Sequence, residues 1–271
     1  MKRFTTSILS ISLGAALILQ FLFGNLPLTA FAFPVNLALV LALAGITFVL
    51  YRENKMYPWL KEWASGTTSI TLIALTGIGS LFIAFVPQWN VQQSWPFAIL
   101  LLLLLNQMLF AIFSYRGRFR KRFYLNHIGL FLFILALSFG AADMHRWKAI
   151  LHEGETIEQA YDSYGIPHTL GYPLRLESFH ISYYENNIPQ TFTARVTSDN
   201  ESQEILVNHP WHKSWKEDIY LTNYGQNEDG SSQYCVVEFI TQPWNPVATL
   251  GIILTAIGSF LLLFGLKTKN K

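Results

Sequence analysis

The sequence predicts a multi-pass membrane protein of about six transmembrane α-helices, with one mainly β domain inserted before the last helix. Three observations lead to this fold class. Apolar segments of span length recur along the chain, cationic residues concentrate in alternate loops, and one long polar stretch interrupts the pattern. Hydrophobic residues make up 51% of the 271 residues and charged residues only 13%, which is typical of a protein that lies in a membrane.

Six segments meet the length and polarity that a membrane span requires. A span needs about 20 mostly apolar residues to cross roughly 30 Å of hydrocarbon. The segments are nearly free of charge and cover about 5–23, 32–51, 68–87, 95–115, 125–144 and 244–266. The first segment could instead be a signal peptide, because "MKRF" precedes it and "LTAFAF" resembles a cleavage site. Its apolar run is longer than the usual signal core of ~7–15 residues, so we expect a helix that stays in the protein.

Lysine and arginine residues predict how these spans are oriented. They precede the first span and follow the second, fourth and sixth, at Lys2, Arg3, Arg52, Lys55, Lys61, Arg116, Arg118, Arg120, Lys121, Arg122, Lys267, Lys269 and Lys271. The connections "GNLPLTAF" and "VPQWNVQQS" contain no lysine or arginine. Because cytoplasmic loops carry the excess of these residues, we expect both termini in the cytoplasm.

Residues 145–243 form the polar stretch, which this orientation places outside the cytoplasm. Alternating apolar residues there predict half-buried strands, in runs at Phe179, Ile181 and Tyr183, at Phe192, Ala194 and Val196, and at Cys235, Val237 and Phe239. The turn sequences "YENNIPQ", "SDNES" and "QNEDGSS" separate these runs, which indicates a small antiparallel sheet or sandwich. The segment "ETIEQAYDSYG" is predicted as a short helix that ends at Gly165.

The sequence contains no pattern typical of soluble catalysis, so no catalytic residue is predicted. Phosphate-binding, dinucleotide-binding, nucleophile-elbow and HExxH motifs are all missing. Cys235 is the only cysteine, which excludes an internal disulfide and a CxxCH haem-attachment sequence, and we expect it to be a small buried hydrophobe. His209 and His212 are close in sequence, but Pro210 and the lack of a further ligand favour a structural turn over a metal site.

His127 is an ionisable residue near the start of the fifth span. At ~1.5 Å per residue it lies roughly 7–8 Å deeper than Arg122, which we expect at the cytoplasmic surface. An apolar face surrounds the ring position, formed by Leu130, Phe131 and Ile134 at helical spacing. Gly129 would allow another helix to approach closely.

Two interpretations of His127 remain open from the residues alone. A neutral imidazole could ligate a metal or a haem iron, because it offers a nitrogen lone pair that the neighbouring apolar side chains do not. The alternative is a hydrogen bond to Asn126, to Asn106 or to a lipid headgroup. The cationic cluster that precedes the span could attract haem propionates, but such clusters serve first to set topology and contact anionic lipid.

From about residue 67 onward the sequence resembles the ResB family, which acts in the system II route of cytochrome c biogenesis. The resemblance rests on segments such as "SWPFAILLLLLLNQMLFAIFS", "RGRFRKRFYLNHIGLFLFILALSFGAAD", "ILVNHPWHKSWKEDIYLTNYG" and "VVEFITQPWNPVATLGIILTAIGSFLLL". It divides the chain into a three-helix core at 67–144, the β domain at 145–243 and a closing helix and tail at 244–271. Residues 1–66 depart from the family by adding a helix pair and a cytoplasmic loop.

The resemblance implies a haem-handling role in the bacterial inner membrane. Family members work with a CcsA-type membrane partner to bring haem across the membrane and attach it to apocytochrome c, and His127 matches the position of a proposed haem ligand. The tryptophans here are dispersed and do not form the partner's tryptophan-rich motif. We therefore expect an accessory subunit of a haem lyase or synthase without independent activity, in contact with lipid and with no nucleic-acid partner.

Two other classes of protein compete with this interpretation. One is a structural or sensory membrane protein whose β domain binds an extracellular ligand, with His127 incidental. The other is a transporter that acts alone, which is weakened because internal repeats and charged residues within the spans are missing.

Overall fold

Six helices of the described chain are long and apolar enough to cross a membrane. The computed structural model describes residues 3–53, 57–115, 117, 120–186, 188–199, 201–225 and 234–264. The six helices are α1 (Arg3–Phe23), α2 (Val35–Glu53), α4 (Gly66–Phe85), α5 (Trp95–Ser114), α6 (Arg120–Phe139) and α7 (Asn245–Phe264). The six predicted spans are therefore confirmed, with ends shifted by a few residues. The cations Lys2, Lys55, Arg116, Arg118, Lys267, Lys269 and Lys271 lie outside the described residues.

Short helices and capping residues connect the spans. A single turn, α3 (Pro58–Trp63), precedes α4, and the turns η1 (Leu28–Phe31), η2 (Pro87–Trp89), η3 (Val91–Gln93) and η4 (Gly140–Asp143) lie beside the ends of the long helices. Ser65 and Ser94 begin α4 and α5, where each side-chain oxygen accepts a hydrogen bond from a backbone N–H of the first turn.

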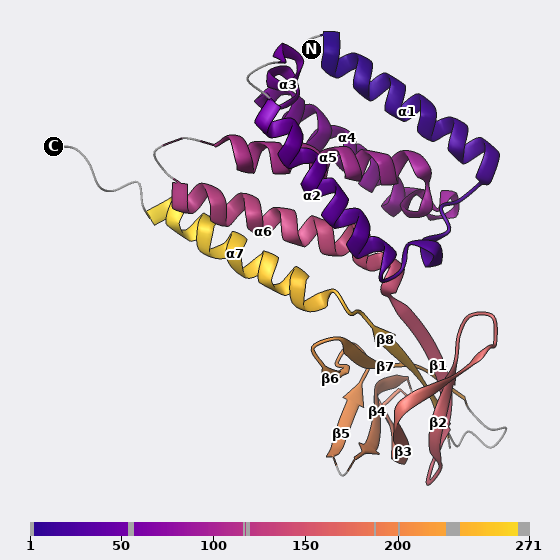
Figure 1. Ribbon diagram of the computed structural model, residues 1–271. Helices are drawn as coiled ribbons and strands as arrows, with labels where there is room; N and C mark the ends of the chain where they lie inside the picture. Colours follow the sequence, from indigo (N-terminus) through magenta and orange to yellow (C-terminus); the bar gives the residue numbers. More distant parts are fainter. Residues whose placement is uncertain are drawn as a thin grey trace. The chain divides into compact units, whose positions relative to one another are not determined.

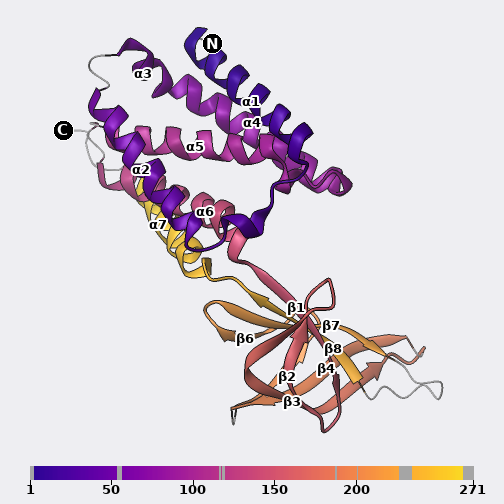
Figure 2. The same cartoon turned by 45° about the vertical axis from the view of Figure 1, so that its right-hand side comes forward.

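Residues 1–143 and 246–271 form one compact unit, and residues 144–245 form a second. In the first unit, α5 contacts α1, α2, α4 and α6, and Figures 1 and 2 both show it between α4 and α6. Polar pairs also join these helices: Gln107 donates to Ser69 Oγ at 2.6 Å, and Asn106 donates to Thr47 Oγ1 at 2.6 Å. Interhelical hydrogen bonds of this kind replace water as the partner of polar groups inside a membrane.

Helix α7 packs directly on α6, and both figures show the two side by side. Glycines allow the close approach, because a Cβ at Gly129 would lie 2.5 Å from Thr255 Oγ1, and one at Gly251 would lie 2.7 Å from the Gly129 carbonyl oxygen. Ser259 adds a hydrogen bond of 3.0 Å to Asn126 Oδ1. The prediction that Gly129 admits another helix is thus confirmed, and that helix is α7.

The second unit is an eight-stranded antiparallel sheet in the order β5-β4-β3-β2-β1-β8-β7-β6. Its strands are β1 (His145–His152), β2 (Thr156–Tyr161), β3 (Pro167–Tyr183), β4 (Pro189–Ser198), β5 (Glu201–Leu206), β6 (Trp211–Ser214), β7 (Glu217–Gly225) and β8 (Tyr234–Thr241). Contacts between β5 and β7 curl the sheet toward a barrel. Inward-facing side chains from most strands fill one apolar core, including Leu151, Leu174, Val196, Ile219 and Val237.

The alternating apolar runs do form strands, as predicted. Most of their members are buried or pack against the core, whereas Tyr183 at the end of β3 is 44% exposed. The turns at "YENNIPQ" and "SDNES" connect paired strands, and "QNEDGSS" lies outside the described residues.

The predicted helix at "ETIEQAYDSYG" is wrong, because residues Thr156–Tyr161 form strand β2. Pairing with β3 along most of its length overrides the helix preference of its Glu, Gln and Ala residues. Gly165 instead closes a turn with φ of 78°, in which Asp162 Oδ1 accepts hydrogen bonds from two backbone N–H groups.

Candidate functional site

The candidate site lies in the first turns of α6, where aromatic rings form a continuous stack. The ring of Tyr115 lies against Phe123 with centroids 3.6 Å apart and planes inclined by 5°. The imidazole of His127 also stacks on the ring of Phe123, with centroids 3.8 Å apart and planes inclined by 22°. Tyr124 meets the edges of both Tyr115 and Phe123. Because Phe123 and His127 are four residues apart on one helix, their rings lie on the same face.

A backbone hydrogen bond fixes which nitrogen of His127 carries the proton. His127 Nδ1 lies 2.9 Å from the carbonyl oxygen of Phe123, one helical turn earlier. A carbonyl oxygen only accepts, so Nδ1 is the donor, and in the neutral imidazole Nε2 keeps the lone pair. Among the described residues no side chain bonds to Nε2, and the imidazole is only half-buried. The ring therefore presents an available nitrogen in a fixed tautomer, as metal-ligating histidines usually do.

Asn126 and Asn106, which the sequence suggested as hydrogen-bond partners of His127, bind other groups. Asn126 bonds Ser259 on α7 and the backbone of its own helix, while Asn106 bonds Trp63 and Thr47. The predicted apolar face is only partly available, because Phe131 and Ile134 pack against the helical core and Leu130 is 41% exposed. The structure thus brings His127 together with Phe123 and leaves Asn106 and Asn126 in helix-to-helix contacts.

A single imidazole fits one axial position of a haem iron but does not complete a site. The described residues contain no group of three His, Cys, Asp or Glu side chains that could hold a metal ion. The stacking ring of Phe123 covers a face of the imidazole, whereas a metal binds in the ring plane at Nε2. The ring can therefore stay stacked on Phe123 while Nε2 remains available as a ligand.

Sequence reasoning missed Phe123 and Tyr115 because it began the fifth span at residue 125. The helix in fact begins at Arg120, so the basic segment contributes its first turn. Extending the helix backwards places Phe123 four residues before His127, which is the spacing that would have revealed both the stack and the carbonyl partner. In the same turn, Lys121 is exposed and Arg122 is half-buried.

Three residues of the β unit that stand out in the sequence have packing, turn and cross-strand contacts. Cys235 is fully buried, and burial, followed by the charge of Glu153, raises the pKa of its thiol to about 12. His209 lies in a tight turn that exchanges two backbone hydrogen bonds with Leu206, as predicted. His212 Nδ1 lies 2.6 Å from Asp218 Oδ1 on the neighbouring strand, so its ring serves a cross-strand pair.

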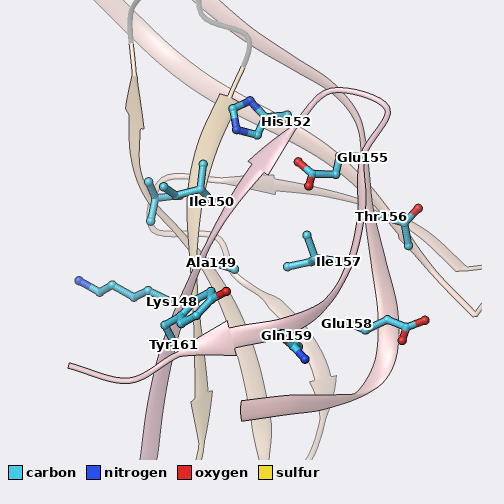
Figure 3. Close-up of a pocket in the computed structure, with 11 residues that line it drawn as sticks. Lys148, Ala149, Ile150, His152, Glu155, Thr156, Ile157, Glu158, Gln159 and Tyr161 are labelled. Atoms are coloured by element: carbon cyan, nitrogen blue, oxygen red, sulfur yellow. The ribbon is translucent and has the colours of Figure 1, made fainter. Parts of the chain in front are cut away.

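A hollow of about 690 Å³ lies in the β unit between β1 and β2 (Figure 3). These strands pair only at Lys148 and Tyr161 and separate beyond that point. Figure 3 shows Ile157 and Glu155 pointing toward the gap, while Lys148 extends away from it. The hollow is lined by both charged and apolar side chains, among them His152, Glu155 and Ile157.

Comparisons with known proteins give a family match and a structural similarity. A sequence profile of the ResB-like family matches residues 104–250, which include the second half of α5, the whole of α6 and of the β unit, and the start of α7. No match was found among curated proteins. Among solved structures the chain is similar to "Cytochrome c Heme Lyase CcmF", with 14% sequence identity and a TM-score of 0.40. That likeness covers 72% of this chain and 34% of the other, so the chain spans about a third of that protein's length.

Proposed function

The chain belongs to the ResB-like family, whose profile matches more than half of its length, and we propose that it is a membrane subunit of a system II cytochrome c biogenesis complex. Family membership and six span-length helices support a membrane role in cytochrome c biogenesis. Within that role, the subunit assists delivery of haem across the membrane and attachment of haem to apocytochrome c. It works with a CcsA-type partner in the bacterial inner membrane, with both termini in the cytoplasm and the β unit outside.

The observation that carries the haem proposal is the fixed tautomer of His127. Its Nδ1–H donates to the Phe123 carbonyl, so Nε2 is left to bind an iron as one axial ligand. The stack on Phe123 holds the ring plane, which reduces the freedom lost when a ligand binds. Haem, when bound, would supply the iron that this nitrogen holds.

The β unit has a different part in this proposal. It contains neither a CxxCH sequence nor an accessible thiol, since Cys235 is fully buried. It therefore does not accept haem covalently, and its exposed strands serve to hold the partner or the apocytochrome in position. The hollow of Figure 3 instead supports the alternative of a ligand-binding structural or sensory protein.

An absorption spectrum of the copurified complex tests the proposal. The protein is purified with its CcsA-type partner, and bound haem gives the characteristic Soret band. Replacement His127→Phe preserves an aromatic ring against Phe123 but removes the nitrogen, so we expect loss of haem and of mature c-type cytochromes with unchanged membrane insertion. Added imidazole should partly restore haem in His127→Ala, because it supplies the nitrogen without repairing packing.

The matched control is His180→Ala, which removes an exposed histidine of β3. This variant should retain haem and cytochrome yield. Unchanged haem content in both His127→Phe and His127→Ala, without imidazole, contradicts the ligand role. If the complex of the unmodified protein contains no haem and the His127 variants leave the cytochrome yield unchanged, the structural or sensory alternative is favoured.

A further inference from the structure

A cavity of about 550 Å³, partly open to the surface, lies in the membrane unit, and His127 is not among its lining residues. Its walls come from α4, α5, α6 and η4, and residues of the α1–α2 connection cover one end. The volume falls within the range of about 300–1,000 Å³ that is typical of sites for small organic ligands. Two lining residues at opposite ends of the α5 wall, Trp95 and Leu104, are nine residues apart, so the cavity runs about 13.5 Å along that helix.

Almost the whole lining is apolar, and only some of its polar side chains already have a hydrogen-bond partner. Ser80 and Ser138 donate to backbone carbonyls of their own helices. The Trp95 Nε1 and Thr76 Oγ1 atoms are buried and have no hydrogen-bond partner among the described residues. A threonine hydroxyl within a helix can rotate onto the carbonyl of the preceding turn, whereas an indole N–H has no such local acceptor. Gln92 also lines the cavity but is exposed, so Trp95 Nε1 is the buried donor of the lining that has no partner among the described residues.

The end of the cavity beside Trp95 is held in place by hydrogen bonds. The backbone N–H of Leu26 donates to the Gln93 carbonyl at 2.7 Å, and the backbone N–H of Trp95 donates to Gln20 Oε1 at 2.9 Å. Phe31 meets the indole ring edge-on, with centroids 6.5 Å apart. These contacts join the end of α1 and its following connection to the start of α5, so the cavity is preformed around the indole.

The depth of the indole in the membrane indicates the chemistry of the occupant. Trp95 is the first residue of a span-length helix, and tryptophan at such positions lies at the boundary between hydrocarbon and headgroups. In that layer the abundant acceptors are the ester carbonyls of phospholipids, and each carries an acyl chain that continues toward the bilayer centre. Below Trp95 the cavity offers an apolar channel in the same direction, lined by Ala98, Leu102 and Leu137.

We propose that this cavity is a phospholipid site in which one acyl chain fills the apolar channel and its ester carbonyl accepts a hydrogen bond from Trp95 Nε1. Leaving the bilayer gives an acyl chain no hydrophobic gain, because lipid and lining are equally apolar. Binding therefore depends on the close fit of the chain and on the hydrogen bond to an indole N–H that has no partner among the described residues. Such a lipid would hold α4, α5 and α6 together with the α1–α2 connection.

Native mass spectrometry of the full chain tests this site. The protein is released from a mild detergent after incubation with phospholipids of defined composition, and the retained lipid is counted per chain. Replacement Trp95→Phe keeps an aromatic ring but removes the donor, so we expect about threefold to tenfold weaker retention of one phospholipid. Trp89→Phe is the matched control, because Trp89 is 63% exposed and does not line the cavity, and it should leave retention unchanged.

A photoreactive phospholipid with a diazirine midway along one acyl chain locates the lipid. Labelling should concentrate on residues that line the cavity in α5 and α6, and Ala98→Phe should suppress it by filling the channel. Equal retention in Trp95→Phe and Trp89→Phe, or labelling spread evenly over the outer faces of the helices, overturns the proposal. Extraction of an isoprenoid quinone from the cavity in place of a phospholipid also overturns it, and none of these results bears on the haem ligand.

Discussion

Asp143 joins the N-terminal helix pair to the rest of the membrane unit, and its removal gives a measurable prediction. Its side chain is 7% exposed and accepts two short hydrogen bonds, from the backbone N–H of Phe33 at 2.7 Å and from Asn36 Nδ2 at 2.7 Å. Asn36 is fully buried and also donates to the Phe139 carbonyl. Replacement Asp143→Ala therefore leaves two donors in a place where water does not reach them easily.

The size of the effect follows from those two bonds. Hydrogen bonds to a charged group contribute about 1.5–3 kcal/mol each, so Asp143→Ala should weaken the local attachment by about 3–6 kcal/mol. Even 3 kcal/mol corresponds to a change of more than a hundredfold in the opening equilibrium. Asp143→Asn should weaken the attachment less than Asp143→Ala does. Its oxygen still accepts from Phe33, while its NH₂ group meets another donor at Asn36.

Hydrogen exchange measured on the full chain reads this opening directly. Amides from the α1–α2 connection and the first turn of α2 should lose protection by about a hundredfold in Asp143→Ala. Asp218→Ala serves as the control, since it removes a carboxylate of the β unit that pairs with His212, and it should not change exchange in this connection. Protection within about threefold of the unmodified protein in Asp143→Ala would refute the idea that these bonds hold the helix pair.

Two further predictions concern the helix seam and the buried thiol. Gly129→Ala should destabilise the packing of α6 on α7 by about 1–3 kcal/mol and lower the melting temperature in detergent, because its Cβ would lie 2.5 Å from Thr255 Oγ1; Gly77→Ala, where a Cβ meets nothing within 4 Å, is the control. The raised pKa of Cys235, about 12, predicts that the folded thiol resists maleimide at pH 8. Its contribution to the stability of the β unit should be complete below about pH 8.5 and lost as pH rises toward 12, and Cys235→Ala should remove this alkaline dependence in a denaturation series.

The sequence was most informative where one physical requirement acts on neighbouring residues. Membrane spans need a fixed length of apolar chain, and strands with one buried face need alternation, so both could be predicted. The segment of β2 was misassigned because its helix-forming residues are held extended by pairing with β3, which is a tertiary effect. Gly129 indicated a close helix but not which one, since the Gly251 that meets it lies beyond the entire β unit.

The candidate site shows the same division between local and distant information. The position of His127 within an apolar span was visible in the sequence, and its partner carbonyl could have been found from helical spacing once α6 was begun at Arg120. The contacts of Asp143 with Phe33 and Asn36 could not, because about 110 residues, including α3, α4, α5 and α6, separate the partners. No local pattern records such a pairing.

The arrangement of α6 explains why a single histidine could work as a positioned ligand. Asn126 and Gly129 lie on the face that α7 covers, with Ser259 bonded to Asn126 and Thr255 in contact at Gly129. His127 lies one position along from Asn126, about 100° around the helix, so the seam fixes the helix backbone without covering the imidazole. Phe123 then fixes the ring from the same helix by stacking and by its carbonyl. This arrangement suits the ligand role proposed for His127, because the backbone is held on one face while the nitrogen stays available on the adjacent face.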